Sequence, residues 1–207
     1  MQMTLPNQLT TLRILLTPLF IWLTISDDPH LRLWGVVVFV VASLTDLYDG
    51  YHARKYGVVT RWGAFMDPLA DKILITSAFL VYVFEGYVEL WMVLVIAFRD
   101  IVVTLLRIYA EVKDKPVITS KSAKLKTFFQ NVFAYVMLLF MFLKEEVFFG
   151  SETASTMTAV LKSPWINHSM LALTIFTIYT GISYLIENWP SLRDAYLGIR
   201  SSLKAII

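Results

Sequence analysis

The sequence contains no cysteine, and charged residues make up only 16% of its 207 positions. The absence of cysteine excludes disulfide bonds and thiolate metal sites. The first 26 residues also lack two parts of a secretory signal peptide, namely a positively charged start and a small-residue cleavage site, and Arg13 interrupts their apolar run. We therefore expect this segment to be retained as a first helix.

Apolar side chains, in contrast, are abundant and occur in several long runs. Hydrophobic residues account for 57% of the sequence, and the mean hydropathy is +0.63, well outside the range of soluble proteins. Runs of about 20 such residues are long enough to cross ~30 Å of hydrocarbon as helices. The sequence therefore predicts an all-α integral membrane protein with a single domain over residues 1–207. Its six expected transmembrane helices cover about 6–26, 32–54, 62–84, 90–111, 125–143 and 169–187.

Two further segments complete this expected architecture. Residues 144–168 contain Gly150, a run of Ser and Thr, and Pro164, and we expect an irregular connection there. In residues 191–207, basic residues alternate with apolar ones, as they do in an amphipathic helix that lies at a membrane surface. The predicted fold is thus six transmembrane helices followed by a C-terminal interfacial helix.

The distribution of Lys and Arg predicts the orientation of these helices. Six spans place both termini on one side, which also carries Lys55, Arg61, five lysines between 112 and 126, and the basic tail. The connections on the opposite side are mainly acidic. By the positive-inside rule, we expect both termini to face the cytoplasm. The short loops suit a bacterial inner (cytoplasmic) membrane.

Four aspartates lie close together in residues 46–71, in or beside segments apolar enough to cross a bilayer. A helix turns about 100° per residue, so Asp46 and Asp49 share one face of their helix, and Asp67 and Asp71 share one face of the next. If these two helices pack as an antiparallel pair, all four carboxylates converge near one membrane surface. An ionisable residue inside a transmembrane segment costs roughly 2.5 to 3.5 kcal/mol, which marks these acids as functional candidates.

The chemistry of this aspartate cluster suits a metal and a phosphate. Oxygen-only sites prefer Mg²⁺ or Mn²⁺, as one ion or as a binuclear pair. Gly50 and Gly63 leave space for a ligand to approach closely, and Arg54 offers a forked set of donors to an anionic phosphate. In the structural alternative, the carboxylates pair with Arg54, Lys55 or Lys72. Four acids on two helices exceed what such pairing needs, so we favour the metal site.

A polar stripe runs along the start of the first helix. Asn7, Thr10 and Arg13 repeat at a spacing of three residues in an otherwise apolar segment. The stripe could be simply interfacial, with Arg13 extending to the lipid headgroups. It could equally contact a bound substrate, and the spacing alone leaves both interpretations open.

Cations near the end of the fourth helix and the start of the fifth form a second candidate site. Arg99 and Arg107 fall on the same broad side of one helix, and Lys124 and Lys126 begin the next. Several converging cations suit a dianionic phosphomonoester. The alternative is that Asp100 pairs with one arginine, while the other arginine and the lysines contact anionic headgroups.

The residues around the aspartates resemble the signature of the CDP-alcohol phosphotransferase family. The matching positions are Asp46-x2-Asp49-Gly50-x2-Ala53-Arg54-x8-Gly63-x3-Asp67-x3-Asp71. The resemblance implies a membrane enzyme in which an alcohol displaces CMP from a CDP-linked lipid. It also implies that Asp46, Asp49 and Asp67 bind the metal, and that Asp71 is the general base with a further role as a bridging metal ligand.

The same resemblance assigns substrate contacts to further residues. The CDP-lipid contacts would be Asn7, Thr10, Arg13, Gly50, Ala53, Arg54 and Gly63. The contacts to the acceptor phosphate would be Arg99, Arg107, Lys124 and Lys126. The pattern Arg99-x7-Arg107, followed by Ser120-x3-Lys124-x-Lys126-Thr127-x2-Gln130, is similar to family members that use glycerol 3-phosphate as the acceptor.

These similarities predict transfer of a phosphatidyl group from CDP-diacylglycerol to glycerol 3-phosphate, giving phosphatidylglycerophosphate and CMP. Two positions depart from the glycerol 3-phosphate pattern, because Ala123 stands where glycine is usual and Asp100 replaces the commoner glutamate. Phosphatidylglycerol and inositol phosphate therefore stay open as alternative acceptors.

The expected partners are CDP-diacylglycerol, glycerol 3-phosphate and the lipid bilayer, with no nucleic acid, and a homodimer is left open. A cation-coupled or proton-coupled transporter is the alternative from another functional class, because intramembrane aspartates also mark ion pathways. Transporters often contain inverted repeats with matching features in both halves. The acids here occupy the second and third helices and have no counterpart in the fifth and sixth, so the sequence favours the enzyme.

Overall fold

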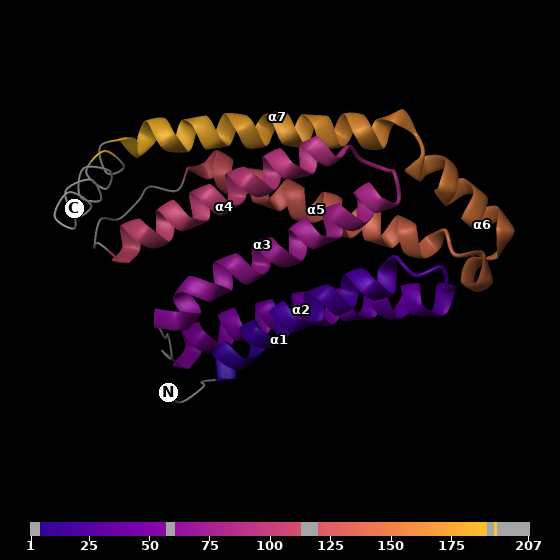
Figure 1. Cartoon of the computed structure of the whole chain (residues 1–207), viewed down its shortest axis with the longest axis horizontal. Helices are drawn as coiled ribbons and strands as arrows, with labels where there is room; N and C mark the ends of the chain where they lie inside the picture. The colour runs from indigo at the N-terminus through magenta and orange to yellow at the C-terminus, as the bar shows by residue number, and fades with distance from the viewer. Residues whose placement is uncertain (1–4, 57–60, 113–119, 190–192, 194–207) are drawn as a thin grey trace, which may run out of the picture.

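The computed structural model describes residues 5–56, 61–112, 120–189 and 193 of the chain. Within these residues the chain forms seven α-helices and no strand. The helices are α1 (Leu5–Thr24), α2 (Pro29–Tyr56), α3 (Arg61–Phe84), α4 (Leu90–Val112), α5 (Lys121–Leu143), α6 (Glu146–Leu161) and α7 (Pro164–Glu187). Figure 1 shows an elongated bundle in which α3 runs between the α1–α2 pair and the group formed by α4, α5 and α7.

Six of these helices coincide with the segments expected from hydropathy. The largest shift is at α7, which begins at Pro164 rather than near residue 169. Proline is favoured in the first turn of a helix, because the N–H that it lacks would have no partner inside the helix there. Pro164 therefore starts α7, whereas we had assigned it to the preceding connection.

The expectation of an irregular connection over residues 144–168 is wrong, because α6 occupies most of that segment. Gly150 has a φ of 78°, which separates two helical pieces rather than ending the helix. The hydroxyls of Ser155 and Thr156 donate to the carbonyl of Glu152 at 2.8 and 2.9 Å. Because side chains of this kind can bond to the preceding turn, a run of Ser and Thr does not exclude a helix.

The C-terminal tail cannot be compared with its prediction in this way. Apart from Arg193, residues 190–207 lie outside the described part of the chain. The amphipathic helix expected over residues 191–207 therefore stays a prediction.

The all-helical fold is compatible with an integral membrane protein. Among the described residues, α5 and α7 are each long and apolar enough to cross a membrane, judged by length and composition. The burial pattern points the same way, because large apolar side chains face outward while charged ones are enclosed. Trp22, Phe98 and Ile186 are 62–72% exposed, whereas Arg13 and Lys126 are 0% exposed. Such a surface suits lipid better than water.

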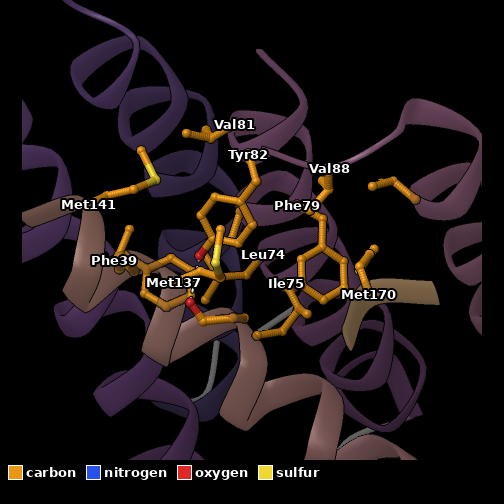
Figure 2. Close-up of a cluster of buried hydrophobic side chains, with 14 of the residues drawn as sticks. Phe39, Leu74, Ile75, Phe79, Val81, Tyr82, Val88, Met137, Met141 and Met170 are labelled. Carbon is orange, nitrogen blue, oxygen red and sulfur yellow. Dashed lines mark hydrogen bonds between the residues drawn. The ribbon is translucent and has the colours of Figure 1, made fainter. Parts of the chain in front are cut away.

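Buried apolar side chains from all seven helices form the core of the bundle, and α3 contributes the most. Figure 2 shows Phe39 of α2 and Met137 of α5 close to Leu74 and Tyr82 of α3. The Tyr82 hydroxyl donates to the carbonyl of Ala134 at 2.5 Å, which satisfies a polar group inside this apolar cluster. The core therefore fixes α3 against α5, two of the three helices that bound the cavity described below.

A cluster of charged residues joins the helices at the end of the bundle opposite the start of α1 and the end of α7. Arg32 contacts Glu145 at 3.1 Å and Glu85 at 3.6 Å. The ammonium group of Lys144 donates to Glu85 at 2.6 Å and to the Tyr87 hydroxyl at 2.8 Å. Burial disfavours the charged form of Lys144, but its hydrogen bonds to Glu85 and Tyr87 outweigh that effect and raise its pKa above 10.5.

Replacing Lys144 with Met should destabilise the protein by about 1–3 kcal/mol near neutral pH, because Glu85 loses a charge-assisted hydrogen bond. A group whose pKa is raised by folding stabilises the protein fully below its unfolded-state pKa. The stabilisation is lost as the pH rises through the folded-state pKa. We expect the difference in thermal unfolding between wild type and Lys144→Met to persist up to about pH 10 and to decline as the pH rises further, through the raised pKa of Lys144.

Thermal unfolding of the detergent-solubilised protein, followed by circular dichroism, measures this difference. Lys162→Met is the matched control, because Lys162 is exposed after the end of α6. Equal stability of the Lys144→Met and Lys162→Met variants near neutral pH would show that the cluster does not hold this end together.

Candidate functional site

The predicted site residues gather at the end of the bundle where α1 begins and α7 ends. Figure 1 shows the starts of α3 and α5 and the ends of α2 and α4 at that same end. Six helices therefore begin or end at this end of the bundle. Their packing brings together polar residues that are distributed from Asn7 to Lys126 along the chain. The expectation that both carboxylate pairs lie near one membrane surface stays a prediction.

Asp67 and Asp71 lie one turn apart on α3, and the side chains of both are partly exposed. The Thr10 hydroxyl of α1 donates a hydrogen bond to Oδ1 of Asp67. Lys72 lies 3.3 Å from Oδ2 of Asp71. The two carboxylates thus meet different neighbours: Asp67 contacts α1, and Asp71 is next to a cation on its own helix.

The other two predicted carboxylates belong to α2. This helix continues to Tyr56, so Asp46, Asp49, Gly50, Ala53 and Arg54 are helical, as expected. The positions of their side chains lie outside the described part of the structure. Convergence of all four carboxylates therefore stays a prediction.

Two of the four predicted metal-binding carboxylates, Asp67 and Asp71, have described side chains. Among the side chains that the structure describes, no three His, Cys, Asp or Glu residues form a group that could hold a metal ion. That set does not include Asp46 and Asp49. Asp67 keeps lone pairs beyond the one that accepts from Thr10, since a carboxylate has about four. The carboxylate of Asp67 is therefore suited to a hard cation such as Mg²⁺ or Mn²⁺, and a site built from all four aspartates stays a prediction.

The polar stripe on α1 faces the interior of the bundle. Thr10 and Arg13 are both 0% exposed, and Asn7 is partly exposed at the start of the helix. The burial of Arg13 argues against extension of this side chain to the headgroups, which was one of the two interpretations of the stripe. Gly63 of α3 is also buried. Of the predicted CDP-lipid contacts on α1 and α3, Thr10, Arg13 and Gly63 are therefore buried, and Thr10 contacts Asp67 directly.

A cavity of about 460 Å³ lies between α3, α4 and α5. Its lining includes Asp71 of α3 and three of the four predicted acceptor-binding cations, Arg99, Arg107 and Lys124. Lys72 adds a further positive charge to the wall. The cavity therefore places a carboxylate that can accept a proton next to four cations that can bind an anion.

Lys126, the fourth predicted acceptor-binding cation, is not part of this lining. Its ammonium group is 0% exposed, and it donates to Oδ1 of Asp100 at 2.5 Å and to Oε1 of Gln130. This placement does not support direct contact between Lys126 and the acceptor. The side chain instead ties α5 to α4 behind the cavity wall.

Asp100 connects Lys126 to the cavity. Its Oδ1 also accepts from Nη1 of Arg99 at 3.2 Å, and Nη2 of Arg99 donates to Thr180 of α7 at 3.2 Å. The pairing of Asp100 with one arginine, considered above as a structural alternative, is thus present. It does not remove Arg99 from the cavity, because both residues line it.

Reasoning from the sequence missed Gln130 and Thr180 as partners in this network. Gln130 lies one turn after Lys126, a spacing that brings two side chains together on a helix. Thr180 had no such signal, because it lies 81 positions from Arg99 and contacts it only through the packing of α7 on α4.

Comparison with known proteins shows the family to which the chain belongs. Residues 3–179 match the CDP-alcohol phosphatidyltransferase family. The chain is 33% identical over 203 residues to a CDP-diacylglycerol–glycerol-3-phosphate 3-phosphatidyltransferase of Bacillus subtilis, covering 92% of this chain and 98% of the relative.

Two further relatives carry names of the same kind. A CDP-diacylglycerol–glycerol-3-phosphate 3-phosphatidyltransferase of Rickettsia typhi is 38% identical, over 65% of this chain and 76% of the relative. A probable phosphatidylglycerophosphate synthase of Mycobacterium tuberculosis is 38% identical, over 62% of each chain. The chain therefore belongs to the CDP-alcohol phosphatidyltransferase family, as the spacing of its aspartates predicted.

Proposed function

We propose that this protein transfers the phosphatidyl group of CDP-diacylglycerol to glycerol 3-phosphate, giving phosphatidylglycerophosphate and CMP. The observation that carries the proposal is the cavity that joins Asp71 to Arg99, Arg107 and Lys124. A base beside converging cations suits an acceptor that has a hydroxyl group at one end and a phosphate at the other. Family membership and the names of the relatives support the same reaction.

In the proposed reaction, a hydroxyl oxygen of the acceptor attacks the phosphorus that carries the diacylglycerol. The bond between this phosphorus and the CMP oxygen breaks, and CMP leaves with the electron pair. Asp71 accepts the proton of the attacking hydroxyl, because a partly exposed carboxylate at the cavity wall can come within hydrogen-bond reach of it. Lys72 lies 3.3 Å from this carboxylate on the same helix.

The aspartates would hold the divalent cation that the family generally uses. Asp46, Asp49 and Asp67 would be ligands of Mg²⁺ or Mn²⁺, and Asp71 would also bridge if two ions bind. The bound metal supplies charge neutralisation for the pyrophosphate and for the departing CMP. The hydrogen bond from Thr10 fixes one oxygen of Asp67 and so restricts the orientation of that carboxylate.

The donor would lie on the α1 side of α3. Asn7, Thr10 and Arg13 would support the CDP-lipid from α1, next to Gly63 of α3. The remaining donor contacts would come from α2, namely Gly50, Ala53 and Arg54. The acceptor would enter from the other side, where the cavity lies between α3, α4 and α5.

Glycerol 3-phosphate suits the cavity for a second reason. Asp100 lines the wall, and its Oδ2 atom is buried without a hydrogen-bond partner among the described residues. A buried carboxylate oxygen without a partner is costly, and a hydroxyl group of the acceptor would satisfy it. A small phosphate ester that carries two hydroxyl groups can supply one hydroxyl for the reaction and the other for Asp100.

We also propose six membrane spans, α1 to α5 and α7, with α6 at the surface opposite the site. The start of α1 and the end of α7 lie at the same end of the bundle, as an even number of spans requires. Lys55 and Arg61, together with Lys121, Lys124 and Lys126 at the start of α5, belong to that end. The positive-inside rule then places both termini and the site on the cytoplasmic side of a bacterial inner membrane.

CMP release by the detergent-purified protein, supplied with CDP-diacylglycerol and a panel of acceptors, tests the proposed function. We expect release that requires Mg²⁺ or Mn²⁺ and occurs with glycerol 3-phosphate, but not with phosphatidylglycerol, inositol phosphate or serine. Metal-dependent release with a different acceptor would keep the reaction class and overturn the acceptor assignment. No release with any acceptor, from protein shown to be folded, would contradict the enzyme and favour a transporter.

Replacing Arg107 with Ala should raise the KM for glycerol 3-phosphate by about tenfold or more, because the acceptor phosphate loses a charge-assisted contact. The KM for CDP-diacylglycerol should change by less than about twofold, since the donor residues lie on other helices. Steady-state CMP release with each substrate varied in turn measures both constants.

Lys121→Ala is the matched control for Arg107→Ala. Lys121 begins α5 at the same end of the bundle, is exposed, and does not line the cavity. It therefore reports any general effect of removing a positive charge from this end. An equal rise of both KM values in Arg107→Ala would mean that Arg107 supports the fold rather than the acceptor.

A further inference from the structure

We propose that Thr180 and Gly181 of α7 are positioning residues that hold Arg99 in place for the acceptor phosphate. The proposal rests on the proposed function, because it takes the cavity between α3, α4 and α5 as the acceptor site. Arg99 lines that cavity, whereas Thr180 and Gly181 do not. The two α7 residues therefore act on the acceptor through Arg99 alone.

Gly181 provides the space in which the stem of Arg99 lies. It is buried, and a Cβ atom added to it would lie 3.0 Å from Cγ and 3.5 Å from Nε of Arg99. A separation of 3.0 Å is shorter than ordinary van der Waals contact, so an added methyl group would displace the arginine. The absence of a side chain at this position thus lets Arg99 pass between α4 and α7.

Thr180 fixes the far end of the same side chain. Its hydroxyl accepts a hydrogen bond from Nη2 of Arg99 at 3.2 Å. The hydroxyl also donates to the carbonyl of Thr177 at 3.0 Å, which sets the direction of the hydroxyl proton and leaves its lone pairs for the guanidinium. Thr180 is 0% exposed, so water does not compete for this contact.

Arg99 is consequently held from two helices. Nη1 is bound by Asp100 of α4, and Nη2 is bound by Thr180 of α7. Because the guanidinium is planar, two hydrogen-bonded nitrogens together with a stem packed against Gly181 determine its plane, and so the directions of its remaining N–H groups. A pre-oriented guanidinium binds an anion at lower entropic cost than a free one. We infer that α7 sets the affinity for the acceptor without contacting it.

Thr180→Val tests whether the hydroxyl group of Thr180 positions Arg99. It should raise the KM for glycerol 3-phosphate by about tenfold, as expected for the loss of one hydrogen bond to a charged group. The KM for CDP-diacylglycerol should stay within about twofold of wild type, and Thr180→Ser should restore the wild-type constant for the acceptor. Equal changes in both KM values, or no rescue by serine, would overturn the proposal.

Thr174→Val is the matched control for this substitution. Thr174 is also 0% exposed on α7, and its hydroxyl donates to the carbonyl of Met170 at 2.8 Å within the same helix. The variant removes an equivalent buried hydroxyl about two turns from Thr180 on the same helix, and both KM values should stay within about twofold of wild type. A rise in the acceptor KM as large as that of Thr180→Val would contradict the specific role of Thr180.

Gly181→Ala tests the space for Arg99 independently of the hydroxyl. We expect the same selective rise in the acceptor KM, by about tenfold. An unchanged acceptor KM would show that the packing at Gly181 does not position Arg99. If the alanine variant fails to fold, Thr180→Val with its serine rescue decides the proposal.

The activity of the wild-type protein distinguishes a failure of this inference from a failure of the proposed function. If wild type releases no CMP with glycerol 3-phosphate, the proposed function fails, and the inference that depends on it fails with it. If wild type is active and the Thr180 and Gly181 variants match it in both KM values, the positioning role alone is refuted.

Discussion

Charged side chains enclosed among apolar helices are the constraint on which this structure depends. Lys126 is 0% exposed and Asp100 is 3% exposed, yet both lie within a bundle whose outer surface is largely apolar. A buried charge is tolerated only when it is paired and hydrogen-bonded. The pairing here runs from Gln130 and Lys126 of α5 through Asp100 and Arg99 of α4 to Thr180 of α7. The network therefore fixes three helices relative to one another and orients one wall of the cavity.

Helix α3 connects the two halves of the candidate site. Asp67 faces α1, where it accepts from Thr10, and Asp71 lines the cavity that α3 shares with α4 and α5. The two aspartates are only one helical turn apart. A donor held from the α1 side and an acceptor held in the cavity would therefore meet near one turn of α3. The core around Tyr82 and Ala134 holds α3 against α5 and so maintains this arrangement.

Much of the fold and of the site could be predicted from the sequence. Six helices follow from runs of apolar residues, and the spacing of the aspartates identified the family. Spacing along one helix also predicted that Asp67 lies close to Asp71, and that Arg99 and Arg107 line the same wall. These predictions succeeded because periodicity along one helix determines which residues share a face.

The errors came from contacts that periodicity does not determine. The helix α6 was missed because Gly150 and a run of Ser and Thr resemble a loop, although a positive φ at one residue only kinks the helix. Lys126 was expected to meet the acceptor, but the packing of α5 on the rest of the bundle turns it toward Asp100. The contact between Thr180 and Arg99 could not be predicted from local spacing, because it depends on how α7 packs against α4.

The central claim is that Asp71 removes the proton of the acceptor hydroxyl. The most direct test is single-turnover CMP release by Asp71→Asn, together with the binding of CDP-diacylglycerol to the same variant. The account predicts that release falls by about a hundredfold or more while the lipid still binds, because an amide cannot accept the proton. Release within about tenfold of wild type would contradict the assignment of Asp71 as the base.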